Sequence, residues 1–447
     1  MSQDGLFDRG PEDAARASQP LPPRIGRRRM RCAVRNQVEF QECSLDDLLP
    51  EDHQARIVWD YVCGLDLSEL TEGIQAVEGG PGQAPADPRI LMTLWLYATL
   101  RGVGSARELN RLCQDHVAYR WICGGVSMNY HTLSDFRTQH TELLDRLLTE
   151  SVASLMAEGL VTMDRVAQDG MKVRASAGAA SFRRQPTLEE ALAEAEAQLA
   201  QLKKELEADP GASKSRQQAA RERAAEERAE RISAALEQLP QIAEGKKAKD
   251  REKARASTTD ADARVMKMGD GGFRPAFNVQ MATDTNSQVI TGVEVTNSGG
   301  DQGQLAPMVE QHEARYERVP DEVVVDGGFA KKEAIETVEQ GGTTVYAPVQ
   351  KSKDPERDAH TPRADDSPAV AQWRQRMATD EAKVIYRERA ATAECVNALA
   401  RNRGLQQFLV RGVRKAKAVM LWYVLAHNLL RAVALRAAAA QVAVAGG

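Results

Sequence analysis

The chain has 447 residues, of which 42% are hydrophobic, so it is long enough for two or three domains with substantial cores. Its formal net charge of −5 argues, taken alone, against a nucleic-acid partner. No apolar run approaches the ~20 residues of a transmembrane helix, and the acidic N-terminus lacks the apolar stretch of a signal peptide. These features predict a cytoplasmic protein with no membrane partner.

The distribution of charge along the chain argues against the conclusion drawn from the net charge. Residues 1–36 are rich in Pro and Arg without periodicity and are predicted to be a disordered tail. Within it, "RIGRRRMR" (24–31) has five arginines and no acid, and residues 395–447 contain eight Arg and Lys but no Asp or Glu. Such asymmetry indicates a nucleic-acid partner, although the cluster at 24–31 is equally explained as a solubilising tail.

The region 37–160 has a helical pattern throughout and is predicted to be an all-α domain. A Pro begins the first clear helix, "DPRILMTLWLYATLRGV" (87–103). Ser105 and Glu108 have the spacing of a capping box. One amphipathic helix is expected from His131 to a glycine stop at Gly159.

After residue 160 the pattern changes to strands that alternate with helices. Residues 165–176 predict a strand, and residues 187–255 predict two antiparallel helices, a coiled-coil-like insertion that either joins two subunits or braces the core. The later expected elements are strands at 276–284 and 288–296, a helix at 301–316, a strand at 321–329, a helix at 330–342, a strand at 343–349, a polar loop at 350–380, and a helix at 381–403 followed by further helix.

Three Asp-Gly pairs occur, at Asp169, Asp270 and Asp326. Asp270 is flanked by glycines and predicts a turn. Asp326 follows the apolar strand "EVVV" and precedes a helix, which is the position where open α/β sheets place their ligands.

Asp169 has two interpretations. An Asp-Gly pair between strand-forming residues favours the exposed tip of a hairpin. However, strand periodicity puts Asp169 on the same face as Met171 and Val173, and the chain beyond Arg174 enters the helical insertion and does not return as a partner strand. The second observation favours a site residue.

Glu394 lies in the expected helix at 381–403, with Arg387 and Arg401 on the same face seven residues away. A glutamate between arginines is often only a surface ion pair. Together with Asp169 and Asp326, however, it gives three carboxylates that can meet at one end of a sheet. Mg²⁺ prefers such oxygen ligands, and a pair of Mg²⁺ ions suits the cleavage of a phosphodiester.

Five segments, in this order, resemble bacterial insertion-sequence transposases of the DDE class, and the resemblance covers about residues 38–435. The first is the helical region from "DPRILMTLWLYATLRGVGSARELNRLCQDHVAYRWICGG" to "HTLSDFR". The others are "DGMKVRASA", "DADARVMKMGDGGFRPAFNVQMATD", "VVVDGGFA" and "YRERAATAECVNALARNRGLQQFLVRGVRKAKAVMLWYVLAHNLLR".

The family's third motif is Tyr, two residues, Arg, three residues, Glu, six residues, Lys. Tyr386 and Arg389 have the family's mutual spacing, but four residues separate Arg389 from Glu394, and Arg401 stands in place of Lys. Either the helix is irregular at this point, or Arg387 makes the phosphate contact in place of Arg389.

The resemblance implies an α/β fold with a ribonuclease-H-like mixed sheet and flanking helices. Its domains would be the tail 1–36, an all-α DNA-end-binding domain 37–160, a catalytic domain 161–435 interrupted by the insertion 187–255, and an Ala-rich tail 436–447.

The resemblance also implies a mechanism, in which phosphodiesters at the element's ends are cut and the freed 3′-hydroxyl is transferred to target DNA. Asp169, Asp326 and Glu394 would be the catalytic residues and would bind two Mg²⁺ ions, with Mn²⁺ as a substitute. The expected DNA-binding residues are Lys172, Arg174, Tyr386, Arg387, Arg389, Arg401, Arg411, Arg414, Lys415 and Lys417.

The expected partner is double-stranded DNA, both element ends and target, bound by a homodimer in a cytoplasmic, nucleoid-associated complex. Two other functions fit the same sequence. One is a ribonuclease-H-like DNA nuclease without strand transfer, and the other is a non-catalytic DNA-binding or scaffold protein that uses the insertion as its partner surface.

Overall fold

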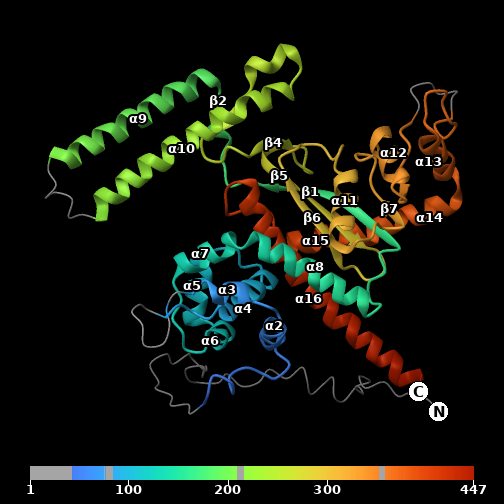
Figure 1. Ribbon diagram of the computed structural model, residues 1–447, viewed down its shortest axis with the longest axis horizontal. Coiled ribbons are helices and arrows are strands. Elements are labelled where there is room, and N and C mark those ends of the chain that lie inside the picture. The colour runs from blue at the N-terminus through green and yellow to red at the C-terminus, as the bar shows by residue number, and fades with distance from the viewer. Residues whose placement is uncertain (1–42, 75, 77–83, 209–215, 352–357, 447) are drawn as a thin grey trace, which may run out of the picture. The chain divides into compact units, whose positions relative to one another are not determined.

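A computed structural model describes residues 43–74, 76, 84–208, 216–351 and 358–446 (Figure 1). The predicted tail 1–36 and its arginine cluster lie outside the described residues. The chain from Leu45 onward forms one compact unit.

Among the described residues from 43 to 157, the regular elements are all helices. Asp87 accepts a hydrogen bond from the Arg89 amide and Pro88 occupies the first turn of α4, so the helix predicted after this Pro is confirmed. Ser105 caps α5 through the Glu108 amide at 3.4 Å, as its spacing predicts. The helices are α2 (Gln54–Cys63), α3 (Ser68–Glu72), α4 (Pro88–Leu100), α5 (Ala106–Asp115), α6 (Val117–Cys123), α7 (Tyr130–Gln139) and α8 (Thr141–Ala157).

The prediction of a single helix from His131 to Gly159 was wrong, because α7 and α8 are separate helices. His140 leaves the helical region of backbone conformation, with φ −109° and ψ 43°. Both helices pack against the long C-terminal helix α16. The predicted stop is confirmed, since Gly159 has a φ of +71°, which favours glycine.

The insertion is the predicted helical hairpin. Helices α9 (Gln185–Ala208) and α10 (Arg216–Glu244) lie side by side (Figure 1). At its base, β2 (Phe182–Arg183) pairs antiparallel with β3 (Ala256–Ser257) and closes the insertion. The expected turn between the two helices lies outside the described residues.

A mixed six-stranded sheet carries the rest of the fold, in the order β4-β5-β1-β7-β8, with β6 also paired to β5. β1 is antiparallel to β5 and parallel to β7, which is parallel to β8. The predicted turn at Asp270 joins β4 to β5. The strands are β1 (Arg165–Arg174), β4 (Arg264–Lys267), β5 (Phe273–Asp284), β6 (Ile290–Thr296), β7 (Glu322–Val324) and β8 (Thr344–Tyr346).

Helices α11 (Leu305–Tyr316) and α12 (Lys332–Gln340) follow β6 and β7, as expected. The prediction of a polar loop at 350–380 was wrong in part, because α13 (Pro368–Ala378) lies within these residues. Ser367 caps this helix, and Trp373 donates a hydrogen bond to the Ala347 carbonyl at 3.0 Å. Apolar side chains of α13 also share a buried cluster with Val345 of β8, which stabilises a segment that has little sequence periodicity.

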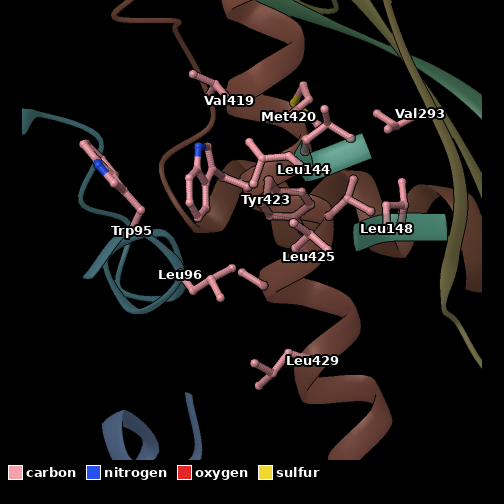
Figure 2. Close-up of a cluster of buried hydrophobic side chains, with 14 of the residues drawn as sticks. Trp95, Leu96, Leu144, Leu148, Val293, Val419, Met420, Tyr423, Leu425 and Leu429 are labelled. Atoms are coloured by element: carbon pink, nitrogen blue, oxygen red, sulfur yellow. The ribbon is translucent and has the colours of Figure 1, made fainter. Parts of the chain in front are cut away.

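Helix α16 (Val413–Gly446) contacts α4, α7, α8 and β6 and thereby joins the helical region to the sheet. Figure 2 shows its residues Met420, Tyr423 and Leu425 among side chains of α4, α8 and β6. The stretch from residue 413 to 444 is apolar and long enough to cross a membrane, but 67% of its most apolar window is buried inside the protein, which is typical of a core helix.

Replacing Trp422 with Ala tests whether α16 holds the two regions together. Trp422 is 1% exposed, and its indole donates to the Arg137 carbonyl of α7 at 2.9 Å. We expect Trp422→Ala to lower the free energy of unfolding by about 3–5 kcal/mol in urea denaturation. Val442→Ala, on the 73% exposed end of the same helix, should change it by less than about 0.5 kcal/mol. Equal stability of the two variants would contradict this packing.

Candidate active site at Asp169, Asp326 and Glu394

Two of the three predicted acids lie at neighbouring parallel strands, Asp169 within β1 and Asp326 two residues beyond the end of β7. Ala167 of β1 pairs with Val324 of β7. Asp169 and Asp326 each come two residues later, so continuing this register puts them side by side on strands that lie about 4.8 Å apart. The electrostatic effect of Asp326 on Asp169 agrees with this placement.

The Asp169-Gly170 pair is not a hairpin turn. Both residues lie inside β1, opposite Met281 and Gln280 of β5, and Gly170 does not have a positive φ. The glycine is required for space, because a methyl group at Gly170 would overlap Asp301 Oδ1 and lie 2.6 Å from Gln280 Nε2. The hairpin interpretation of Asp169 is therefore wrong.

Asp169 is a largely buried carboxylate with a side chain that is 17% exposed. Burial raises its pKa, the nearby Arg389 guanidinium opposes the rise, and the negative charges of Asp326 and Asp301 add to it. Asn397 Nδ2 donates to Asp169 Oδ2 at 2.8 Å. One carboxylate oxygen is thus held by an amide, and the other faces Arg389 at 3.6 Å.

Glu394 is linked to Asp169 by Arg389, across an irregular stretch of helix. Between α14 (Asp380–Arg389) and α15 (Cys395–Asn402) the chain forms a π-helical turn, η4 (Ala390–Glu394). This wider turn accommodates the extra residue between Arg389 and Glu394. Arg389 Nη2 donates to Glu394 Oε1 at 2.5 Å while Nη1 faces Asp169, so Arg389 bridges the two carboxylates. Of the two explanations for the spacing, the irregular helix is confirmed.

The opposite face of β1 carries a polar network that the sequence analysis missed. Asp301 accepts hydrogen bonds from Lys172 at 3.0 Å, Asn278 at 2.7 Å and Gln280 at 2.8 Å. These three side chains come from β1 and β5. The alternation of Asn278 and Gln280 in "AFNVQMATD" was the available signal, because polar residues two apart on a buried strand need a shared partner.

The chemistry of the donors fits a divalent cation such as Mg²⁺. Asp169, Asp326 and Glu394 offer only oxygen atoms, and Arg389 is the cation that now compensates two of them. Asp326 Oδ1 accepts from the Gly328 amide at 2.7 Å, which fixes that carboxylate. Among the described residues, no three acidic, histidine or cysteine side chains are close enough together to hold one metal ion.

The predicted DNA-binding residues include cations that are paired with acids, one tyrosine, and cations that are exposed. Lys172, Arg414 and Lys417 are paired with Asp301, Glu142 and Glu294 at 3.0, 2.8 and 2.8 Å. Tyr386 lies under Arg389, with the guanidinium 5.9 Å from the ring centroid. Of the predicted residues, the exposed cations for which the described part of the chain shows no ion pair are Arg174, Arg387, Arg401, Arg411 and Lys415.

Asn397 is a second residue that the sequence analysis missed. It comes three residues after Glu394, in the first turn of α15, and its side chain is buried where it meets Asp169. That spacing was a usable signal, but an asparagine in a helix has many ordinary roles and was not distinctive.

Two families match this chain. Residues 43–139 match the family described as "Transposase domain (DUF772)", and residues 249–429 match the family described as "Transposase DDE domain". Asp326 and Glu394 lie within the second match, whereas Asp169 and the insertion up to residue 248 lie between the two. No curated protein and no solved structure matches the chain.

The fold is a helical region followed by a mixed sheet with acids at its centre. Transposase families match both parts, and such families are enzymes that act on DNA. Together, the two matches indicate an insertion-sequence transposase of the DDE class.

The close packing at Gly170 gives a prediction for the site. Gly170→Ala should force Asp301 and Gln280 apart and lower the free energy of unfolding by about 1–3 kcal/mol. Gly178→Ala is the matched control, because a methyl group there meets nothing within 4 Å. Urea denaturation of both variants measures the difference, and a Gly170→Ala protein as stable as the control would show that Gly170 is not packed in this way.

Proposed function

We propose that Asp169, Asp326 and Glu394 form the catalytic centre of this transposase, within a ribonuclease-H-like catalytic domain at residues 161–435. The observation that carries the proposal is that Asp326, just beyond the end of β7, acts electrostatically on Asp169 of the adjacent strand β1, while Arg389 links Asp169 to Glu394. Two Mg²⁺ ions, when bound, would activate the attacking oxygen and stabilise the leaving oxygen of a phosphodiester.

The surrounding groups fix the orientation of the carboxylates and balance their charge. Asn397 fixes the orientation of Asp169, and the Gly328 amide fixes Asp326. Arg389 balances the negative charge of Asp169 and Glu394 in the protein without DNA, and it is positioned to contact the phosphate being cut. The exposed Arg387, Arg401, Arg411 and Lys415 would bind flanking phosphates and contribute affinity without sequence preference.

The reaction we propose has two steps at one centre. Water attacks a phosphodiester at the element end and releases a 3′-hydroxyl, and that hydroxyl then attacks a phosphodiester of target DNA. Each step exchanges one phosphodiester P–O bond for another P–O bond, so no external energy source is needed. We infer that the helical domain at 37–160 recognises the ends and that two copies of the chain bring two ends together at the nucleoid.

Incubating the full chain, Mg²⁺ and element-end DNA with a supercoiled plasmid tests this function. The proposal predicts cleaved ends and products in which an end is joined to the plasmid. Cleavage without joined products would instead support a nuclease that lacks strand transfer, and DNA binding without cleavage would support a scaffold protein.

Asp326→Asn and Asp270→Asn are matched variants for the same assay, since both are Asp-Gly aspartates and only Asp326 lies at the site. Replacing a residue that only supports a metal ligand typically lowers metal affinity or activity about 10–100-fold. Replacing a ligand itself should therefore lower the cleavage rate more than about 100-fold. Asp326→Asn should therefore lose cleavage and keep DNA binding, while Asp270→Asn, in its surface turn, should keep both. Equal rates in the two variants would refute the assignment of Asp326.

A further inference from the structure

Asp301 lies in the loop between β6 and α11 and is not one of the proposed catalytic residues. Its side chain is 19% exposed. It accepts hydrogen bonds from Lys172 at 3.0 Å, Asn278 at 2.7 Å and Gln280 at 2.8 Å. Because these donors come from β1 and β5, the carboxylate has a fixed place on the sheet.

Asp301 reaches the glycines that follow two of the proposed catalytic acids. A methyl group on Gly170, next to Asp169, would overlap Asp301 Oδ1. A methyl group on Gly328, two residues after Asp326, would lie 3.7 Å from Asp301 Oδ2 and 2.8 Å from Asp326 Oδ1. The carboxylates of Asp301 and Asp326 therefore flank the same point.

The charge of Asp301 acts on the proposed centre even though its donors lie on the other face of β1. Burial is the main cause that raises the pKa of Asp169, and the negative charges of Asp326 and Asp301 add to the rise. The side chains of Asp169 and Asp301 are both mostly buried, so water and salt screen their interaction only in part.

Acids outnumber cations among the described residues that meet here. The three proposed catalytic acids and Asp301 carry four negative charges, against the two positive charges of Arg389 and Lys172. Such an excess of negative charge attracts a divalent cation, and the number of charged carboxylates tunes the affinity of a cation site.

Stability does not account for the network around Asp301. Lys172 and Asp301 form a mostly buried ion pair, and such pairs are often no more stabilising than apolar residues of similar size. In the described part of the chain, the buried Gln168 Oε1 and Asn278 Oδ1 of the same network have no hydrogen-bond partner, which costs free energy. An effect of the charge on the neighbouring centre explains why a carboxylate lies here.

Resting on the proposed function, we propose that Asp301 increases the affinity of the centre for its divalent cation and that Lys172 limits this effect by cancelling part of the charge. Both oxygens of Asp301 already accept hydrogen bonds from Lys172 Nζ, at 3.0 and 3.1 Å. Asp301 therefore acts through its charge and is not itself a ligand.

The binding of Mn²⁺ to the full chain without DNA, measured by titration calorimetry, tests this role. Asp301→Asn removes the charge but keeps the size of the side chain, and it should weaken binding about 10-fold. Lys172→Met removes the opposing charge and should not weaken binding. Asp270→Asn is the control for the loss of one acid, because Asp270 lies in a surface turn, and it should bind as the wild type does.

Cleavage of an element-end duplex at increasing Mg²⁺ gives a second readout. For Asp301→Asn, the Mg²⁺ concentration at half the maximal rate should rise about 10-fold. The rate at saturating Mg²⁺ should stay near that of the wild type, because the proposed ligands are intact. Damage to packing would instead lower the rate at saturating Mg²⁺, and this outcome would contradict the proposal.

The proposal is overturned if Asp301→Asn binds Mn²⁺ as tightly as the wild type. It is also overturned if Lys172→Met weakens binding as much as Asp301→Asn, since both variants break the same ion pair. If Asp301→Asn does not fold, the double variant with Lys172→Met is compared with Lys172→Met alone. It should bind about 10-fold more weakly, and equal binding would refute the role of Asp301.

Asp326→Asn separates this proposal from the proposed function. Mn²⁺ binding that is equal in the wild type and Asp326→Asn, together with cleavage that survives the change, would refute the proposed centre. Binding and cleavage that depend on Asp326 but not on Asp301 would refute only the role of Asp301.

Discussion

The placement of a carboxylate, Asp169, in the interior of a buried strand is the constraint on which the arrangement around it depends. Its charge is largely shielded from water, so neighbouring groups have to compensate it. Arg389 supplies the opposite charge and Asn397 a hydrogen bond, both from the helix that carries Glu394. The π-helical turn is what allows Arg389 to meet both Asp169 and Glu394. On the other face, Gly170 leaves room for Asp301, which in turn holds Lys172.

Much of the fold could be predicted from residue patterns, because local signals agree with the final structure. The cap at Ser105, the β5–β6 hairpin and the helical insertion each have a strong short-range pattern. The predictions failed where contacts between distant segments decide the structure. Helix α13 depends on Trp373 reaching β8, and the break at His140 lies where two helices pack on α16, a contact nearly 300 residues away in sequence.

In the candidate site, too, local patterns could be predicted from the sequence and contacts between distant residues could not. Asp326 could be placed from sequence because a strand ends there, and its neighbour on β1 follows from the parallel register. Asp301 and Asn397 could not, because their importance comes only from which residues they meet: Lys172 lies 129 positions from Asp301, and Asp169 lies 228 positions from Asn397. The extra residue before Glu394 was visible in the sequence, but only the structure shows that a wider helical turn absorbs it.

The central claim is that Asp169, Asp326 and Glu394 act as one centre. It is tested most directly by the single-turnover cleavage rates of Asp169→Asn, Asp326→Asn, Glu394→Gln and the triple variant on the same element-end duplex. Residues that work as a unit are not additive, so each single variant should lose about as much activity as the triple variant. Losses that multiply from one substitution to the next, or a Glu394→Gln protein that cleaves at the wild-type rate, would contradict the account.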